Sequence, residues 1–135
     1  MTNEELIALA INAMDNAYVP YSNYRVGAAL LTTSDKVYTG CNIENASYSP
    51  TVCAERTAIF KAVSEGEREF VKIAVAGGKN GEISGEFPPC GVCRQVMAEF
   101  CEDDFVILVV NGENSFNEYK LSDIFPFAFN SKHIK

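Results

Sequence analysis

Two short stretches of the sequence decide how the chain folds: "TVCAER" at residues 51–56 and "FPPCGVCRQ" at residues 87–95. The first places Glu55 two residues after a cysteine, and the second places a Cys-x-x-Cys pair directly after two prolines. Apolar residues recur at three- and four-residue spacing behind each stretch, which predicts that each one begins a helix. Three thiols and one carboxylate therefore stand at the starts of two helices.

Glu55 lies on the apolar face of the first of these helices. It precedes the other members of that face by three, four, seven and eight residues, namely Ala58, Ile59, Ala62 and Val63. An unpaired carboxylate in a protein interior costs roughly several kcal/mol, and it is kept where a partner or a proton-transfer task compensates. We therefore interpret Glu55 as a candidate catalytic residue.

The three cysteines of the two stretches are candidate metal ligands. Cys93 shares the apolar stripe of its helix, while Cys53 and Cys90 lie where the two helices start. Helix N-termini favour thiolates, and three thiolates with one open position are a common arrangement for catalytic zinc. We predict one Zn²⁺ with water in the fourth position. Cys-x-Glu with Pro-Cys-x-x-Cys is also a variant of the zinc deaminase signature, in which the glutamate moves protons and is not a ligand.

Arg56 is a basic residue beside the predicted catalytic Glu55. Three thiolates leave Zn²⁺ with a net charge of −1, which weakens the ion as a Lewis acid unless positive charge lies close by. Arg56, adjacent to Glu55, and the two helix dipoles are the available sources. We predict that Arg56 tunes the charge of the site.

Other interpretations of the five cysteines stay open at this point. The Cys-x-x-Cys pair would also suit a redox disulfide, and four cysteines, with Cys41 added, would suit a structural zinc that leaves Glu55 unexplained. Cys41 ends a predicted strand and Cys101 a predicted helix, so both are predicted to be core thiols. His133 lies in a polar tail and is predicted to be exposed.

Composition and charge exclude several classes of protein. The 135 residues are 47% hydrophobic and 21% charged, which predicts a single folded domain over 1–135. A net charge of −7 without a basic run argues against nucleic-acid partners. The longest apolar run, "FVILVV" at 105–110, is too short to cross a membrane, and the N-terminus is acidic. We expect a cytoplasmic protein with no membrane partner.

Hydrophobic periodicity predicts an α/β fold. The expected elements are a helix over 2–17 with a Thr2/Glu5 capping box, strands at 25–31 and 36–41, a helix over about 53–65, a strand at 71–78, a helix from Gly91, a strand at 105–110 and a tail. Strands separated by helices predict a sheet with helices against its faces. The initial hairpin makes this sheet mixed rather than all-parallel.

Three longer stretches resemble a known family: "YVPYSNYRVGAAL" at 18–30, "GCNIENASYSPTVCAERTAIFKAVSEGE" at 40–67 and "PPCGVCRQVMAEF" at 88–100. In this order they resemble the small, homotetrameric cytidine deaminases, from about residue 5 to residue 130. The resemblance implies a three-layer α/β/α sandwich with a mixed five-stranded sheet. It also implies hydrolytic, zinc-dependent deamination of cytidine and deoxycytidine in pyrimidine salvage, one zinc per subunit, and a homotetramer whose subunits share active sites.

The resemblance also implies roles for residues at the predicted metal site. Cys53, Cys90 and Cys93 match the family's zinc ligands, and Glu55 matches its proton shuttle. In the family's scheme this glutamate takes a proton from zinc-bound water and gives it to ring N3, so that hydroxide attacks C4. It then protonates the departing amine, and the products are ammonia and uridine or deoxyuridine.

Further residues match the family's nucleoside-binding positions. Asn42 and Glu44 resemble the ribose-hydroxyl ligands, and the backbone of Ala54 resembles the group that meets the base. Without the family, Asn42 and Glu44 would be ordinary loop residues after a strand. A carboxylate at the sugar would repel a 5′-phosphate, and no Arg or Lys lies within residues 41–53, which favours a nucleoside over a nucleotide.

Two positions depart from the family pattern. Tyr24 replaces the usual Phe; its ring can still pack by the pyrimidine, but its hydroxyl needs a partner. In "IFPFAF" at 124–129, Phe129 resembles the residue that reaches into a neighbouring subunit's pocket, and Phe127 is bulkier than the family's residue. Three phenylalanines within residues 125–129 would aggregate on a monomer, which independently favours an oligomer.

Two rival functions stay open from the sequence. An aminonucleoside-antibiotic deaminase of the same superfamily would be expected to lack the Asn-x-Glu pair at 42–44. A non-enzymatic, zinc-stabilised binding module would need four protein ligands and would have no task for Glu55.

Overall fold

The N-terminal helix forms where the capping box predicts it. In the computed structural model, which describes residues 1–112 and 114–135, α1 spans Asn3–Ala13. The side chain of Thr2 accepts a hydrogen bond from the backbone N–H of Glu5, and the Glu5 side chain reciprocates at Thr2. The predicted helical segment is thus confirmed, except that its last turn, Met14–Asn16, is a 3₁₀ helix.

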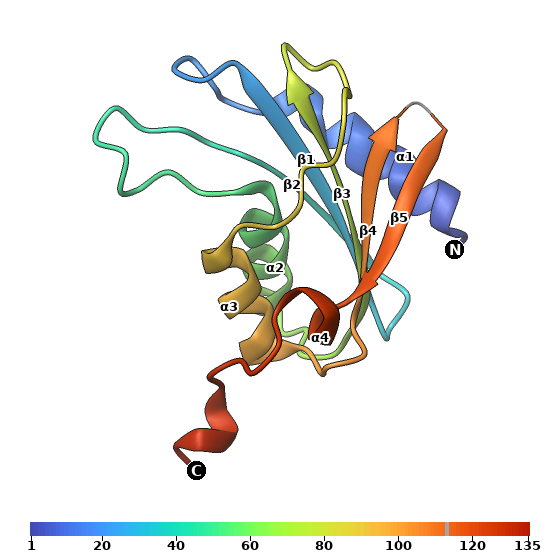
Figure 1. The fold of residues 1–135 in the computed structure, drawn as a ribbon, viewed down its shortest axis with the longest axis vertical. Coiled ribbons are helices and arrows are strands. Elements are labelled where there is room, and N and C mark those ends of the chain that lie inside the picture. The colour runs from blue at the N-terminus through green and yellow to red at the C-terminus, as the bar shows by residue number, and fades with distance from the viewer. Residues whose placement is uncertain (113) are drawn as a thin grey trace.

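Within the residues that the structure describes, the chain forms one five-stranded mixed sheet (Figure 1). Its strands are β1 (Tyr24–Thr32), β2 (Val37–Cys41), β3 (Phe70–Lys79), β4 (Val106–Gly112) and β5 (Ser115–Lys120). They lie in the order β2-β1-β3-β4-β5. Only the β3–β4 pair is parallel, and the other neighbours are antiparallel. The predicted hairpin and the mixed sheet are both confirmed.

Helices cover both faces of the sheet, as a three-layer sandwich requires. Figure 1 shows α1 on one face and α2 (Ala54–Ser64) with α3 (Gly91–Phe100) on the other. On the α1 face, Leu6 and Ala10 pack against Ala29, Ala74 and Leu108. A second core on the opposite face holds the buried residues of α2 and α3 against the odd-numbered residues of β3 and β4, namely Ile73, Val75, Ile107 and Val109. The predicted α/β/α fold is confirmed.

The segment predicted as a tail contains more structure than its pattern indicated. β5 is an edge strand of mostly exposed residues, so it lacks the continuous apolar run that marked β4. Phe116 packs toward the α1 face and Tyr119 toward the opposite face. A short helix, α4 (Leu121–Ile124), and a 3₁₀ turn at Ser131–His133 follow. The fifth strand that the family resemblance implied is therefore present.

Two further features complete the description of the fold. α2 ends before Gly66, whose φ of +99° closes the helix in the left-handed conformation that glycine tolerates best. Among residues 1–112 and 114–135, no helix has the length and apolarity needed to cross a bilayer.

Candidate active site

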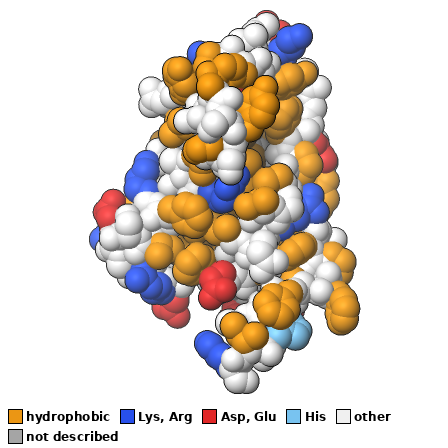
Figure 2. Space-filling view, turned by 90° about the vertical axis from the view of Figure 1, so that its left-hand side faces the viewer, with side chains coloured by type: hydrophobic (Ala, Val, Ile, Leu, Met, Phe, Trp, Pro, Cys, Tyr) orange, Lys and Arg blue, Asp and Glu red, His pale blue; other side chains and the backbone are white. Residues whose placement is uncertain are grey.

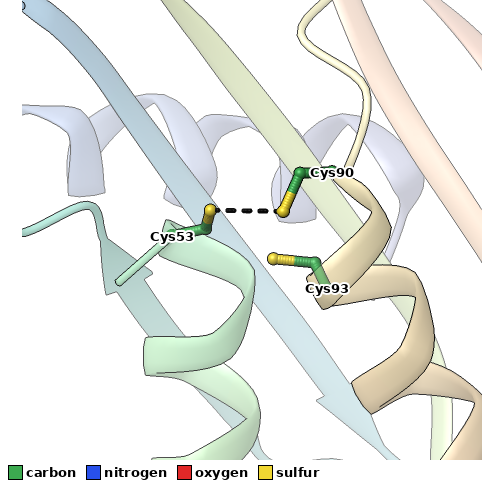
Figure 3. Close-up of side chains that lie close together, drawn as sticks. All are labelled: Cys53, Cys90 and Cys93. Atoms are coloured by element: carbon green, nitrogen blue, oxygen red, sulfur yellow. Dashed lines mark hydrogen bonds between the residues drawn. The ribbon is translucent and has the colours of Figure 1, made fainter. Parts of the chain in front are cut away.

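Two helix N-termini bring three sulfur atoms together (Figure 3). Cys53 is the N-cap of α2 and Cys90 is the N-cap of α3, while Cys93 is buried in the first turn of α3. The Cys53 and Cys90 sulfurs lie 3.6 Å apart, and all three Sγ atoms lie within 4.8 Å of one another. The thiols are free, and their side chains point toward a common centre.

This donor set fits a zinc ion. Tetrahedral zinc with Zn–S bonds of about 2.3 Å holds its sulfurs about 3.8 Å apart, close to the Cys53–Cys90 separation. Neither N-cap side chain is used in a helix-capping hydrogen bond, so both sulfurs are available as ligands. Within the described residues the cluster contains these three cysteines and not Cys41, so a four-cysteine structural site is not formed. A three-ligand site keeps a position open for a reacting molecule.

Positive charge lies directly against this cluster. The Nη2 atom of Arg56 donates a hydrogen bond to the Cys53 sulfur over 3.4 Å. Hydrogen bonds from Cys93 and from Arg56 lower the pKa of Cys53, which favours the thiolate form of this sulfur. The Nε–H of Arg56 is buried and has no partner among the described residues. The guanidinium is thus placed to offset the negative charge of three thiolates.

The carboxylate of Glu55 is buried beside the cluster but is not part of it. The residue is only 3% exposed and shares its helix face with Ala58, Ile59 and Ala62, as predicted. Burial raises the pKa of Glu55 to about 7, because the ionised form loses its hydration. A carboxyl group with this pKa can both accept and release a proton near neutral pH.

A pocket of about 280 Å³ opens onto Glu55. Its remaining walls come from the start of β1, the loop after β2, the α2 N-terminus and the segment before α3, namely Tyr24, Val26, Asn42, Cys53, Ala54, Phe87, Pro88 and Cys90. Other hollows exist on the surface, and one near Arg25 is larger, but this pocket reaches both a metal-ligating cysteine pair and Glu55. We therefore take it as the candidate active site.

Asn42 is fixed at the side of the pocket by the backbone of β1. Its Oδ1 accepts from the Val26 N–H at 2.9 Å, and its Nδ2 donates to the Tyr24 carbonyl at 2.8 Å. An amide oxygen has two lone pairs and an NH₂ group has two hydrogens, so each end keeps one hydrogen-bonding position. Asn42 therefore presents a fixed donor and acceptor to the pocket.

Glu44 lies outside this pocket, in a separate hollow that it shares with Tyr21 and Ser22. Its Oε1 accepts from the N–H groups of Tyr21 (3.0 Å) and Ser22 (3.1 Å), and its Oε2 accepts from the Ser22 hydroxyl. The hydrogen bond from the Ser22 side chain leads the effects that lower the pKa of Glu44. The carboxylate is therefore held ionised by a loop 22 residues earlier in the chain.

Of the other predicted substrate residues, two line the pocket and one does not. Ala54 is fully buried at the first position of α2 and lines the pocket, and Tyr24 also lines it. Phe129 does not line this pocket; it is 59% exposed, its ring stacks on His133, and its carbonyl accepts a hydrogen bond from Gln95. Figure 1 shows this C-terminal segment extending beyond the sheet and α3.

The structure also adds pocket residues that the sequence patterns did not single out. Val26, Phe87 and Pro88 all line the pocket, and the ring of Phe87 lies 5.6 Å from that of Tyr24. Phe87 falls in a segment that its glycines and prolines marked only as loop. Its position directly before "PPC" was the available signal, because whatever precedes Cys90 must approach the metal ligands.

The remaining cysteines and the histidine lie away from this chemistry. Cys41 and Cys101 are partly buried, and burial raises the pKa of both thiols, that of Cys101 to about 12. Cys101 packs against the core between the sheet and α3, and His133 is exposed in the tail. These placements agree with the expectation that none of the three belongs to the site.

The fold and the site together define a class of protein. Three thiols gather at two helix N-termini on one face of a mixed sheet, beside a buried carboxylate that lies outside the ligand cluster. This arrangement is that of the zinc-dependent deaminases.

Comparison with known proteins identifies the family within this class. Residues 1–109 match the family model "Cytidine and deoxycytidylate deaminase zinc-binding region", and the chain belongs to this family. It is 46% identical over 134 residues to a cytidine deaminase of Sporosarcina psychrophila and 48% identical over 134 residues to one of Halalkalibacterium halodurans. These matches cover 99% of this chain and 96% and 98% of the two relatives.

A solved structure agrees with this assignment. The crystal structure of a cytidine deaminase from Burkholderia pseudomallei is 46% identical, covers 96% of this chain and 100% of its own, and superposes with a TM-score of 0.88. The family match and the cysteine cluster together confirm zinc as the cofactor and a deaminase as the class of enzyme.

Proposed function

We propose that this protein is a zinc-dependent hydrolase that deaminates cytidine and deoxycytidine to uridine and deoxyuridine with release of ammonia. The observation that carries the proposal is the buried Glu55 carboxyl beside the Cys53–Cys90–Cys93 cluster at the base of one pocket. The family match and the full-length similarity to cytidine deaminases support the same reaction.

Cys53, Cys90 and Cys93 would hold the zinc. When bound, zinc supplies a Lewis acid that makes water nucleophilic at neutral pH. Arg56 offsets part of the thiolate charge through its contact with Cys53, and so preserves the acidity that the metal confers.

Glu55 carries the protons in this proposal. Its carboxylate accepts a proton from the attacking water and delivers it to ring N3, and the oxygen of that water bonds to C4. It then delivers the second proton of the water to the amine, which leaves as ammonia while C4 becomes a carbonyl carbon. One group can serve both steps because its pKa lies near 7.

Asn42, Ala54 and Tyr24 would orient the nucleoside. The free hydrogen-bonding positions of Asn42 suit a ribose hydroxyl, the backbone of Ala54 at the start of α2 suits the polar edge of the base, and the Tyr24 ring suits its face. Because hydrogen bonds to the β1 backbone already fix the Asn42 side chain, little conformational entropy is lost when it binds the substrate.

Glu44 would complete the sugar site and select against nucleotides. It is ionised and held by Tyr21 and Ser22, and it lies two residues beyond Asn42. A 5′-phosphate near this carboxylate would be repelled, and no lysine or arginine lies within residues 41–53 to offset the repulsion. We therefore favour nucleosides over nucleotides, although the matched family includes deoxycytidylate deaminases.

A homotetramer with shared active sites is the proposed assembly. Phe127 is fully exposed and adopts a positive φ of 55°, and Phe129 is exposed and does not line the pocket of its own chain. Figure 2 shows hydrophobic side chains over much of the face where the 42–52 loop and α3 lie, with scattered charges between them. The rings of Tyr18, Tyr21 and Tyr48 are also exposed. Subunit contacts would cover these rings and bring Phe129 to a neighbour's pocket.

We also propose where the enzyme acts and which partners it does without. A single catalytic domain over 1–135, a net charge of −7 and a nucleoside substrate suit a cytoplasmic enzyme of pyrimidine salvage that needs no nucleic-acid or membrane partner.

A spectrophotometric assay on metal-quantified protein tests the proposal. Zinc-loaded protein is expected to convert cytidine and deoxycytidine, to act far more slowly on the 5′-phosphates, and not to act on an aminonucleoside antibiotic. Preference for the antibiotic would favour the rival deaminase, and no turnover of any of these compounds would favour the binding module. Size measurement at low concentration, with activity followed in parallel, tests the assembly: a stable, active monomer would exclude shared sites.

A further inference from the structure

Phe87 lines the active-site pocket, yet the proposed reaction assigns it no task. It lies on the loop between β3 and α3, three residues before the ligand Cys90. Its ring centroid is 5.6 Å from that of Tyr24, and the two ring planes are inclined by 34°. The two aromatic rings therefore form one continuous wall of the pocket that contains Glu55.

The position of Phe87 is built into the sheet below it. Gly77 of β3 lies against the Phe87 ring and is paired with Val26 of β1. A Cβ atom at Gly77 would lie 3.0 Å from Cγ of Phe87 and 3.0 Å from a Val26 methyl group. Such contacts are closer than side chains normally make, so glycine is needed here for the ring to settle against the strand.

Two hydrogen bonds tie the loop before α3 to the edge strand β5. Glu86, directly before Phe87, accepts hydrogen bonds from Asn117 Nδ2 and from the Tyr119 hydroxyl, the latter at 2.8 Å. Both donors lie on β5, the edge strand, with their side chains on the α2–α3 face. We call these three residues, Glu86, Asn117 and Tyr119, the Glu86 latch. It anchors the loop on one side of Phe87, while Cys90 anchors it on the other.

We propose that Phe87 contacts the pyrimidine ring as a second aromatic wall beside Tyr24, and that the Glu86 latch positions it. The inference rests on the proposed function and names a binding residue for that same site. A flat aromatic base gains from contact with a pre-positioned ring, because little conformational entropy is lost when the ring is already fixed. This contact is made by substrate and transition state alike, so its loss should raise KM and leave kcat nearly unchanged.

The direct test compares Phe87→Leu with Phe87→Tyr in zinc-loaded protein. Leu keeps the apolar volume and removes the ring, whereas Tyr keeps the ring. We expect KM for cytidine to rise about tenfold in Phe87→Leu with kcat within about threefold of the wild type, and KM in Phe87→Tyr to stay near the wild-type value. Zinc content and melting temperature are measured on each variant.

The latch is tested at the surface, where substitution does not disturb the core. Asn117→Asp places a carboxylate against Glu86 and should raise KM about fivefold through repulsion. Glu86→Gln combined with Asn117→Asp reverses the donor and the acceptor and should restore the wild-type KM. The Tyr119 hydroxyl, which shares Oε1 of Glu86 with Asn117, then donates to the carboxylate introduced at position 117. A role in general stability alone would lower the melting temperature without a KM effect that the double variant reverses.

The outcomes separate this inference from the proposed function. A wild type that converts cytidine, beside Phe87→Leu and Asn117→Asp variants with unchanged KM, overturns the inference and leaves the proposed function standing. If Phe87→Leu does not fold, the KM values of Asn117→Asp and the double variant decide the matter. A zinc-loaded wild type that does not convert cytidine overturns the proposed function and this inference with it.

Discussion

The sulfur atoms of Cys53 and Cys90 lie 3.6 Å apart although 37 residues separate them in the chain. Each cysteine occupies the N-cap position of a helix, and the two helices pack on the same face of the sheet, so the fold itself sets this distance. Removal of one ligand should therefore weaken the metal site without rearranging the sheet.

Cys90→Ser tests the metal site. Loss of a thiolate should reduce zinc affinity by more than the roughly 10–100-fold that loss of an outer-shell partner costs. Competition with a chromophoric chelator measures the affinity, and Cys41→Ser serves as the matched control because Cys41 lies outside the cluster. Equal loss of affinity in both variants would contradict the three-cysteine site.

Arg56→Ala tests the charge balance at the cluster. Without the guanidinium beside Cys53, the deprotonated form of the metal site is less favoured, so the acidic limb of the pH–kcat profile should move up by about one pH unit. Arg56→Lys keeps the charge and should move the limb less. A profile in Arg56→Ala that coincides with that of the wild type would exclude this role.

Burial of Glu55 predicts a pH dependence of stability in the metal-free protein. Because the folded-state pKa is about 7, above the ordinary value of 4.5, the folded protein binds the proton more tightly than the unfolded chain. Stability should therefore fall as pH rises from about 4.5 to about 7, by about 3 kcal/mol from this residue alone. Urea unfolding across this range measures the effect, and Glu55→Gln should remove it. An equal slope in both proteins would show that the carboxylate is not desolvated.

Gly77→Ala tests the close packing of Phe87 against β3. The added methyl group would lie 3.0 Å from the Phe87 ring, and overpacking of this kind costs about 1–3 kcal/mol. Gly91→Ala is the matched control, because a Cβ atom there meets no atom within 4 Å. Chemical denaturation compares the two variants, and similar stabilities would mean that the ring moves aside freely.

Periodicity predicted the parts of the site that depend on local structure. The burial of Glu55 and Cys93 followed from their spacing on helices, and both helix starts followed from the cysteines and prolines around them. The β5 strand was missed because its residues are mostly polar and exposed, and its pairing is set by β4 rather than by its own pattern.

Contacts between distant segments could not be predicted in this way. The hydrogen bonds of Glu44 with Ser22 and of Glu86 with Asn117 join residues 22 and 31 positions apart. The packing of Phe87 against the sheet depends on Gly77 in β3. Such contacts follow from the packed sheet, and neither residue of a pair carries a local signal for the other.

The most direct test of the central claim is kcat for cytidine in Glu55→Gln against the wild type, at equal zinc content. Glutamine preserves the shape of the buried side chain and removes its proton-transfer capacity. We expect kcat to fall by about 10²–10⁴-fold, the usual contribution of a positioned acid–base group, while zinc remains bound. A Glu55→Gln variant with kcat within tenfold of the wild type would contradict this claim.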